Sequence, residues 1–299
     1  MVGRVVEVAT DGRYLSVDRG FFVVADRQTE IGRVALDEMA ALIANAHGLT
    51  LTNNLLVRLA ERGIPVVLCG ANHMPAAIVW PVDGHHAQTG RMADQMEAAL
   101  PLKKRLWAQI VRAKILAQGA VLAAVGAPAG GFRLLSRKTR PGDPENVEAE
   151  AARRYWPLLF GADFRRDRDS GGTNAMLNYG YAVLRAGVAR AVFATGLHPG
   201  FGLMHSNRSN PMVLVDDLME PFRPIVDREI WRLIRGGKAE MDSDTKAALA
   251  RIMVIDLPTR FGLSPLMTCA ERLAQSLARI YGGEDTELDL PAPSLPLET

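Results

Sequence analysis

The amino-acid sequence changes its pattern near residue 80, and this change constrains the fold more than any other feature. Before it, short apolar runs rich in Val, Tyr, Phe and Ile are separated by Gly12 and Gly20, a pattern typical of strands and tight turns. After it, apolar residues recur at helical spacing over long stretches, with glycine or proline near most ends. The sequence therefore predicts an α+β protein with a small N-terminal β-rich domain and a larger all-α C-terminal domain.

The expected elements follow this division. Strands are predicted at residues 4–8, 14–17, 21–25, 65–69 and 76–80, with helices at 35–46 and 53–62. Longer helices are predicted at residues 102–125, 144–159, 173–194, 212–234, 244–255 and 266–281. The two domains are then 1–82 and 92–283, joined by a polar, turn-rich linker at 83–91. Acids and three prolines predict a disordered tail at 284–299.

Length and composition exclude several classes of protein. A chain of 299 residues, 48% of them apolar, can bury one large core or two ordinary ones. The 18-residue stretch 115–132 has no charge, but it contains five glycine or proline residues and does not fit a membrane span. Glu7 interrupts the apolar run that a signal peptide needs, and two cysteines 200 residues apart indicate neither a disulfide framework nor a zinc site. We therefore expect a cytoplasmic protein with no membrane contact.

Positive charge is concentrated in the body of the chain. The last sixteen residues hold five acids and no base, which leaves 35 basic against 28 acidic residues, or +7, on residues 1–283. Nine basic residues and no acid lie between Lys103 and Arg140. This asymmetry favours a polyanionic partner, although a solvated helix face has the same composition.

One predicted helix carries three acids close together. Asp216 and Asp217 precede Glu220 by four and three residues, so either can share its helix face and offer oxygens to one divalent cation. Pro221 and Pro224 should end or kink the helix and leave Glu220 at its C-terminal edge, where a carboxylate opposes the helix dipole and needs a cation nearby. Acids that are simply solvated remain the alternative.

Two further candidates lie upstream of this helix. A glycine-rich loop at 196–207 contains His205 and can approach a ligand closely. In the helix predicted at 144–159, Glu148 lies on the apolar face, whereas Glu150 points about 200° away. A glutamate on an apolar face is unfavourable unless it meets a cation, which is either a metal or a neighbouring arginine.

Together these segments resemble the CRISPR-associated adaptation integrases, the family that inserts new spacers into the repeat array, over nearly the whole chain. Three residues match the family's catalytic, metal-binding positions: Glu148 in E-A-E-A-A-R-R-Y-W, His205 at the end of G-F-G-L-M-H, and Glu220 in D-D-L-M-E-P-F-R-P. Asp217 matches a further acidic position of the family, which implies a neighbouring role. The segment around Glu220 is most similar to the version that accompanies type II systems.

The resemblance implies a metal-dependent transesterification, in which a 3′-hydroxyl of captured DNA attacks a phosphodiester of the CRISPR repeat. The implied cofactor is Mg²⁺ or Mn²⁺, which suits one nitrogen among oxygen ligands. The implied partners are the captured duplex, the repeat DNA, a second copy of the chain and a small CRISPR-associated partner dimer, with the RNA-guided effector nuclease as a further candidate. Arg137, Lys138 and Arg140 are expected to hold DNA phosphates without reading bases.

Two other functions fit parts of the sequence. The segment D-D-L-M-E is also typical of isoprenoid synthases, but that class predicts an all-helical chain with a second aspartate-rich helix. The other alternative is a non-catalytic, dimeric scaffold that binds DNA ends. Metal-dependent cleavage or joining of branched DNA distinguishes this scaffold from the integrase.

Overall fold

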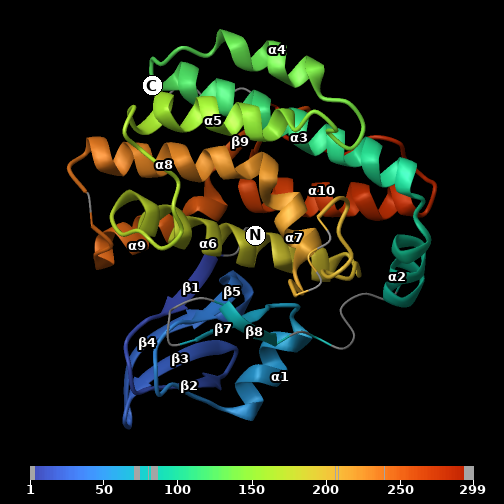
Figure 1. Ribbon diagram of the computed structural model, residues 1–299. Helices are drawn as coiled ribbons and strands as arrows, with labels where there is room; N and C mark the ends of the chain where they lie inside the picture. Colours follow the sequence, from blue (N-terminus) through green and yellow to red (C-terminus); the bar gives the residue numbers. More distant parts are fainter. Residues whose placement is uncertain are drawn as a thin grey trace.

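The protein is a mixed α+β structure with its strands gathered in the N-terminal part, which confirms the predicted fold class (Figure 1). The computed structural model describes residues 4–70, 75–79, 81, 87–205, 207, 209–238 and 240–292. Within these ranges no helix is long and apolar enough to cross a bilayer.

Eight strands form two four-stranded sheets. They are β1 (Arg4–Val8), β2 (Arg13–Asp18), β3 (Phe21–Asp26), β4 (Thr29–Ala35), β5 (Met39–Ala44), β6 (Thr50–Leu51), β7 (Val66–Cys69) and β8 (Pro75–Val79). One sheet has the order β1-β5-β7-β8 and the other β4-β3-β2-β6. Both sheets share a core with helix α1 (Asn53–Glu61), to which Leu15, Phe22 and Leu55 contribute.

The prediction of a helix at 35–46 is wrong, because this segment forms a 3₁₀ turn (Leu36–Glu38) and then strand β5. Strand β5 has a parallel neighbour on each side. Its residue Leu42 lies in the core between the sheets, and Ile43 lies in the core beneath the helices. A strand buried on both faces is uniformly apolar, so its pattern does not distinguish it from a buried helix.

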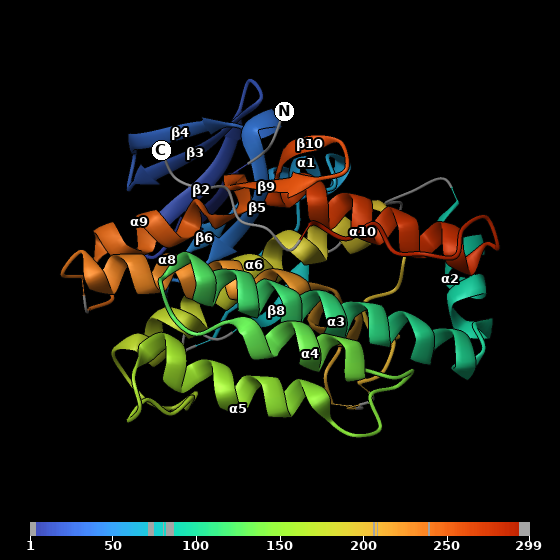
Figure 2. The same cartoon turned by 90° about the horizontal axis from the view of Figure 1, so that it is seen from above.

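Nine helices follow in the described part of the chain. They are α2 (Gln88–Glu97), α3 (Leu100–Ala124), α4 (Gly130–Lys138), α5 (Val147–Phe160), α6 (Thr173–Ala194), α7 (Val213–Met219), α8 (Arg223–Arg235), α9 (Ser243–Ala250) and α10 (Leu266–Tyr281). The long helix α6 lies between the first sheet and α8 (Figures 1 and 2). A Cβ on Gly180 would lie 2.5 Å from Val226, so glycine allows α8 to approach α6 closely. Sheet and helices are therefore joined by one continuous core.

The C-terminal part is not all-helical, and the predicted linker ends early. Strands β9 (Asp256–Thr259) and β10 (Gly262–Pro265) form an antiparallel hairpin between α9 and α10. Pro258 and the positive φ of Gly262, +96°, are incompatible with a continuous helix here. Helix α2 begins at Gln88, inside the linker predicted at 83–91, of which residues 83–86 lie outside the described part.

The disordered tail predicted from residue 284 is wrong for the residues up to Ala292. Leu288 is buried, and its backbone N–H donates to Gln109 Oε1 at 2.9 Å. The N–H of Asp289 donates to Ser276 Oγ at 2.9 Å, and that of Ala292 donates to the carbonyl of Pro258 at 2.8 Å. Leu288 and Leu290 are the only leucines between residues 284 and 292, and two leucines do not form a hydrophobic period, so the sequence gives no sign of this docking. Residues 293–299 lie outside the described part.

This docking predicts that Leu288→Ala destabilises the protein. Truncation of a buried leucine leaves a cavity and costs about 2–5 kcal/mol, so the free energy of unfolding in urea should fall by that order. The exposed neighbour Glu287 serves as control, because Glu287→Ala removes no packing. Equal stability of the two variants would show that the segment does not pack in solution.

Candidate active site

The helix predicted at 212–234 is interrupted at Glu220, as its prolines predict. Helix α7 ends at Met219, one 3₁₀ turn covers Glu220–Phe222, and α8 begins at the next residue. Pro221 has no N–H to continue the hydrogen bonds of α7. Glu220 therefore lies at a junction between two helices, where it is only 6% exposed.

Two cations flank the buried carboxylate of Glu220. Lys114 Nζ on α3 lies 2.5 Å from Oε2, and Arg223 Nε lies 2.9 Å from Oε1. Neither contact has hydrogen-bond geometry, so both are ion pairs and Oε2 is buried without a hydrogen bond. Burial raises the pKa of Glu220, but Lys114 and Arg223 outweigh burial and hold this pKa below its ordinary value.

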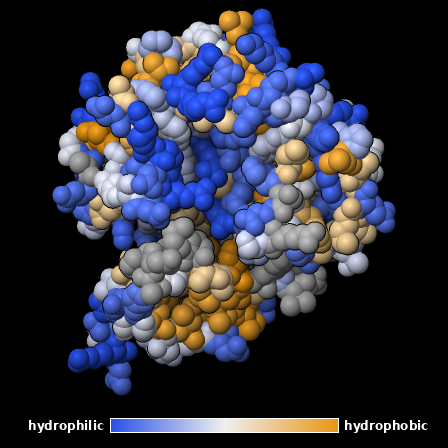
Figure 3. Space-filling view, in the orientation of Figure 1, coloured by the Kyte–Doolittle hydropathy of each residue, from blue (hydrophilic) through white to orange (hydrophobic). Residues whose placement is uncertain are grey.

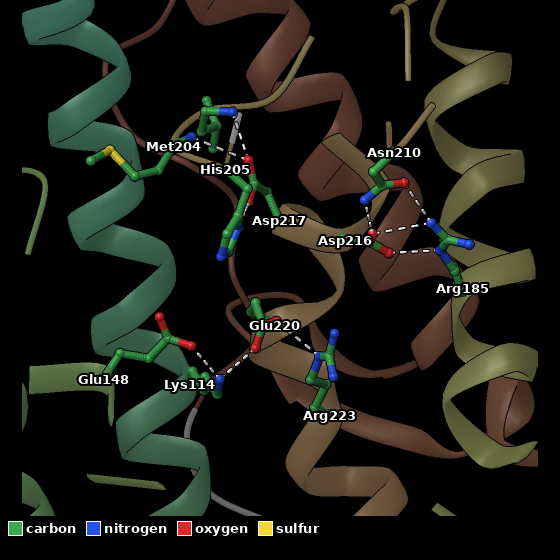
Figure 4. A network of polar contacts seen from close by, with 11 residues as sticks. Lys114, Glu148, Arg185, Met204, His205, Asn210, Asp216, Asp217, Glu220 and Arg223 are labelled. Atoms are coloured by element: carbon green, nitrogen blue, oxygen red, sulfur yellow. Dashed lines mark hydrogen bonds and ion pairs between the residues drawn. The ribbon is translucent and has the colours of Figure 1, made fainter. Parts of the chain in front are cut away.

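Glu148 reaches the same ammonium from α5. The carboxylate of Asp143 accepts the backbone N–H groups of Val147 at 2.9 Å and Glu148 at 3.0 Å, which fixes the first turn of α5. Lys114 donates to Glu148 Oε1 at 2.5 Å and thereby bridges Glu148 and Glu220, which we call the acidic pair (Figure 4). Burial opposes the charge of Lys114, but the acidic pair outweighs it and raises the pKa of this lysine. The cation beside Glu148 is thus a lysine of α3 rather than an arginine.

Asp217 fixes the orientation of His205. Its fully buried carboxylate accepts the backbone N–H groups of Leu203 at 2.7 Å and Met204 at 3.2 Å, and its other oxygen binds His205 Nδ1. The hydrogen bond to Asp217 raises the pKa of His205 although burial opposes it, and the acidic pair raises it further. Since Nδ1 is engaged, Nε2 is the nitrogen that can bind a ligand. The ring points toward the space between the acidic pair (Figure 4).

Close packing beside Asp217 keeps the imidazole in place. The indole of the buried Trp107 lies edge-on to the His205 ring, with 5.0 Å between ring centres. A Cβ on Gly202 would lie 2.8 Å from Asp217 Oδ2 and 2.6 Å from a methyl group of Val213. Glycine at this position therefore allows the loop to wrap around the carboxylate.

The loop that carries His205 is also held from α2. Gln95 is fully buried, and its Nε2 donates to the carbonyls of His198 at 2.9 Å and Phe201 at 2.8 Å. Its Oε1 accepts the N–H of His198 at 2.8 Å. Gln95 could not be identified from the sequence, because one amide side chain on a short helix carries no signal of a partner about a hundred residues away.

Two acids near the site do not face the acidic pair. Asp216 binds Arg185 at 2.7 Å and accepts a hydrogen bond from Asn210 at 2.6 Å. The prediction that Asp216 can share a cation with Glu220 is therefore wrong. Glu150 forms an ion pair with Arg154 one turn later on α5, as expected for a residue on the opposite side from Glu148.

The basic run between Lys103 and Arg140 divides into different environments. Lys114 lies inside the site, whereas Arg137 and Lys138 are exposed at the end of α4. Arg140 is exposed but forms an ion pair with Glu145. Arg137 and Lys138 are therefore better placed than Arg140 to contact a polyanion.

The chemistry of the site fits a divalent cation, although its present geometry is not that of a metal centre. In the described part of the chain, no three His, Cys, Asp or Glu side chains are arranged to hold a metal ion. Lys114 lies between the acidic pair instead. Carboxylates and imidazoles are nevertheless groups that bind Mg²⁺ or Mn²⁺ in proteins, and a carboxylate on the second ring nitrogen is usual for a metal-binding histidine. Figure 3 shows a hollow lined by hydrophilic side chains in the helical half of the molecule.

Comparison with known sequences identifies the family of this chain. The sequence model described as CRISPR associated protein Cas1 matches residues 6–253. The chain belongs to this family. A relative from Neisseria meningitidis serogroup C, named CRISPR-associated endonuclease Cas1, is 37% identical over 247 residues, which cover 81% of each chain. A second relative of that name, from Pyrobaculum aerophilum, is 28% identical over 290 residues, 91% of this chain and 94% of the relative.

Solved structures show the same fold as this Cas1 family member. A casposase bound to integration product superposes with a TM-score of 0.83 at 18% identity, covering 99% of this chain and 95% of the casposase. A Cas1 protein from Thermotoga maritima superposes with a TM-score of 0.78 at 15% identity, covering 95% and 98%. Membership of the Cas1 family excludes the isoprenoid synthase alternative.

The contact between Asp217 and His205 predicts the effect of Asp217→Asn, which keeps the shape of the side chain and removes its charge. The pKa of His205 should fall, as measured by NMR titration of the imidazole protons. A raised pKa of His205 stabilises the parent fully at a pH below the ordinary histidine pKa, and this stabilisation is lost as the pH rises through the raised pKa. The difference in unfolding free energy between parent and variant should therefore narrow with increasing pH. His198, whose pKa is lowered by burial, is the internal control. An unchanged pKa of His205 in the variant would contradict the hydrogen bond between Asp217 and His205.

Proposed function

We propose that this chain is a divalent-metal-dependent DNA integrase, which joins 3′-hydroxyl ends of captured DNA to phosphodiesters of the CRISPR repeat during spacer acquisition. The observation that carries the proposal is the acidic pair, bridged by one cation with the oriented His205 ring above it. The names of the relatives, CRISPR-associated endonuclease Cas1, support a nuclease, and the casposase bound to integration product supports a joining reaction.

The acidic pair and His205 Nε2 would hold Mg²⁺ or Mn²⁺. The ion would act as a Lewis acid toward the reacting phosphodiester and make the 3′-hydroxyl a better nucleophile. Asp217 keeps the imidazole of His205 turned toward the acidic pair, and Arg223 balances the charge of Glu220 from the opposite side. The buried Oε2 of Glu220, which makes no hydrogen bond, is a suitable ligand atom.

The proposed partners are captured and repeat DNA, a second copy of the chain, and the small Cas2 dimer. A Cas6-RT-Cas1–Cas2 complex superposes on this chain with a TM-score of 0.76 at 17% identity, and a Cas1–DNA complex with a TM-score of 0.52 at 16% identity. The segment around Glu220 supports the type II version of the system, acting in the cytoplasm, with the RNA-guided effector nuclease as a further partner.

Charge removal at the site distinguishes the integrase from a non-catalytic scaffold. Glu220→Gln keeps size and removes a ligand charge, and His205→Ala removes the ligand nitrogen. In each variant, strand transfer into a repeat-bearing duplex should fall by about two orders of magnitude or more, while DNA affinity persists. Glu150→Gln, on the far side of α5, should join DNA within about twofold of the parental rate. Joining at the parental rate by both site variants would leave the scaffold as the better description.

The basic residues at the end of α4 can be tested by the salt dependence of duplex binding. Replacing Arg137 and Lys138 together with alanine should flatten the log–log slope by about 0.9 for each DNA phosphate that these side chains neutralise in the parent. Arg140→Ala is the matched control, because that guanidinium is paired with Glu145, and its slope should change less. If the slope of the double variant equals that of the parent, this end of α4 is a solvated surface.

A further inference from the structure

Lys114 engages the same two oxygens that the proposed metal needs. Its Nζ lies 2.5 Å from Glu148 Oε1 and 2.5 Å from Glu220 Oε2. The ammonium therefore lies between the two oxygens, where a cation that bridges them would also lie. The side chains of Lys114, Glu220 and Glu148 are 13%, 8% and 22% exposed, so water screens the charges of the three groups only in part.

The charges of the acidic pair are already balanced by the protein. The acidic pair carries two negative charges, and Lys114 and Arg223 carry two positive ones. A divalent ion on the acidic pair would add two positive charges next to the ammonium. Like charges this close repel strongly where little water screens them. The ion and the ammonium are therefore alternatives for the same pair of oxygens.

Arg223 does not compete with the metal for the same oxygens. It contacts Oε1 of Glu220, the oxygen turned away from Lys114, and its guanidinium lies 4.8 Å above the ring of Tyr181. This stacking holds Arg223 beside the acidic pair rather than between its members (Figure 4). The competition for the ligand oxygens is thus confined to Lys114.

We propose that Lys114 is a built-in competitor of the divalent metal, whose ammonium holds the acidic pair together and is displaced when the metal binds. The inference rests on the proposed metal-dependent function. Lys114 keeps the two carboxylates assembled in the absence of metal, and it sets a metal concentration below which they remain closed around the ammonium. Lys114 is therefore a positioning residue that acts through the metal ligands.

Metal affinity, measured without DNA or activity, tests this role. Isothermal titration calorimetry with Mn²⁺ on the full chain should give a dissociation constant at least about ten times lower for Lys114→Met than for the parent, because the competing charge is gone. Lys103→Met is the control, since it removes the same charge from α3 about three turns earlier and should leave the affinity unchanged. Glu220→Gln identifies the site, because it should abolish this binding.

Thermal unfolding gives a second readout. Without added metal, Lys114→Met should melt below the parent, because the acidic pair has lost a counter-charge, and saturating Mn²⁺ should close this gap. Lys114→Gln, which keeps a hydrogen-bond donor but no charge, provides a milder variant if the methionine variant does not fold without metal. A purely structural lysine would lower stability in both conditions and would not tighten metal binding.

The outcomes separate this inference from the function on which it rests. If the parent shows no Mn²⁺ binding that is lost in the Glu220→Gln variant, the proposed metal-dependent function is wrong. If the parent binds Mn²⁺ but both Lys114 variants bind it equally or more weakly, the competition is wrong and the function stands. If neither variant folds even with saturating Mn²⁺, the competition is also wrong, because the metal should replace the missing charge.

Discussion

Glu220 is a carboxylate removed almost completely from water, and the organisation of the site depends on how its charge is compensated. A buried carboxylate without partners is strongly unfavourable, and removing one partner of a buried ion pair typically costs about 3–5 kcal/mol. Compensation comes from Lys114 on α3 and Arg223 on α8. Since Lys114 also binds Glu148, one ammonium connects α3, α5 and the α7–α8 junction. The geometry of the acidic pair and the packing of these helices therefore depend on the same charges.

Neighbouring acids in one segment have different roles because a helix turns by about 100° per residue. Asp216 points to Arg185, and Asp217 points to the loop that carries His205. Glu220 begins the 3₁₀ turn one turn after Asp216, and its carboxylate lies beside Lys114. Helical spacing thus identifies acids that can share a face, but the partners packed around the helix decide which of them belongs to the acidic pair.

The sequence predicts those parts of the structure whose signal is local. The bounds of α6 and α10 are as predicted, because each is a long apolar pattern that ends at a glycine or proline nearby. Strand β5 and the docked segment at Leu288 depend on tertiary burial and leave no period in the sequence. The need for a cation near Glu148 and near Glu220 was likewise predictable, but the sharing of Lys114 was not. In the sequence that lysine is one of nine bases, and only the packing of α3 distinguishes it.

The site has two halves that are held in different ways. The acidic pair is fixed by helices and ion pairs, whereas His205 lies on a loop, with its side chain 52% exposed. A loop fixes a side chain less precisely than a helix does, so the imidazole needs other restraints. Asp217 and Gln95, both without solvent exposure, provide them through hydrogen bonds to the loop backbone. Gln95 belongs to α2, the first helix after the N-terminal sheets, so the position of α2 constrains the imidazole. The placement of the His205 imidazole thus depends on an amide more than a hundred residues earlier in the chain.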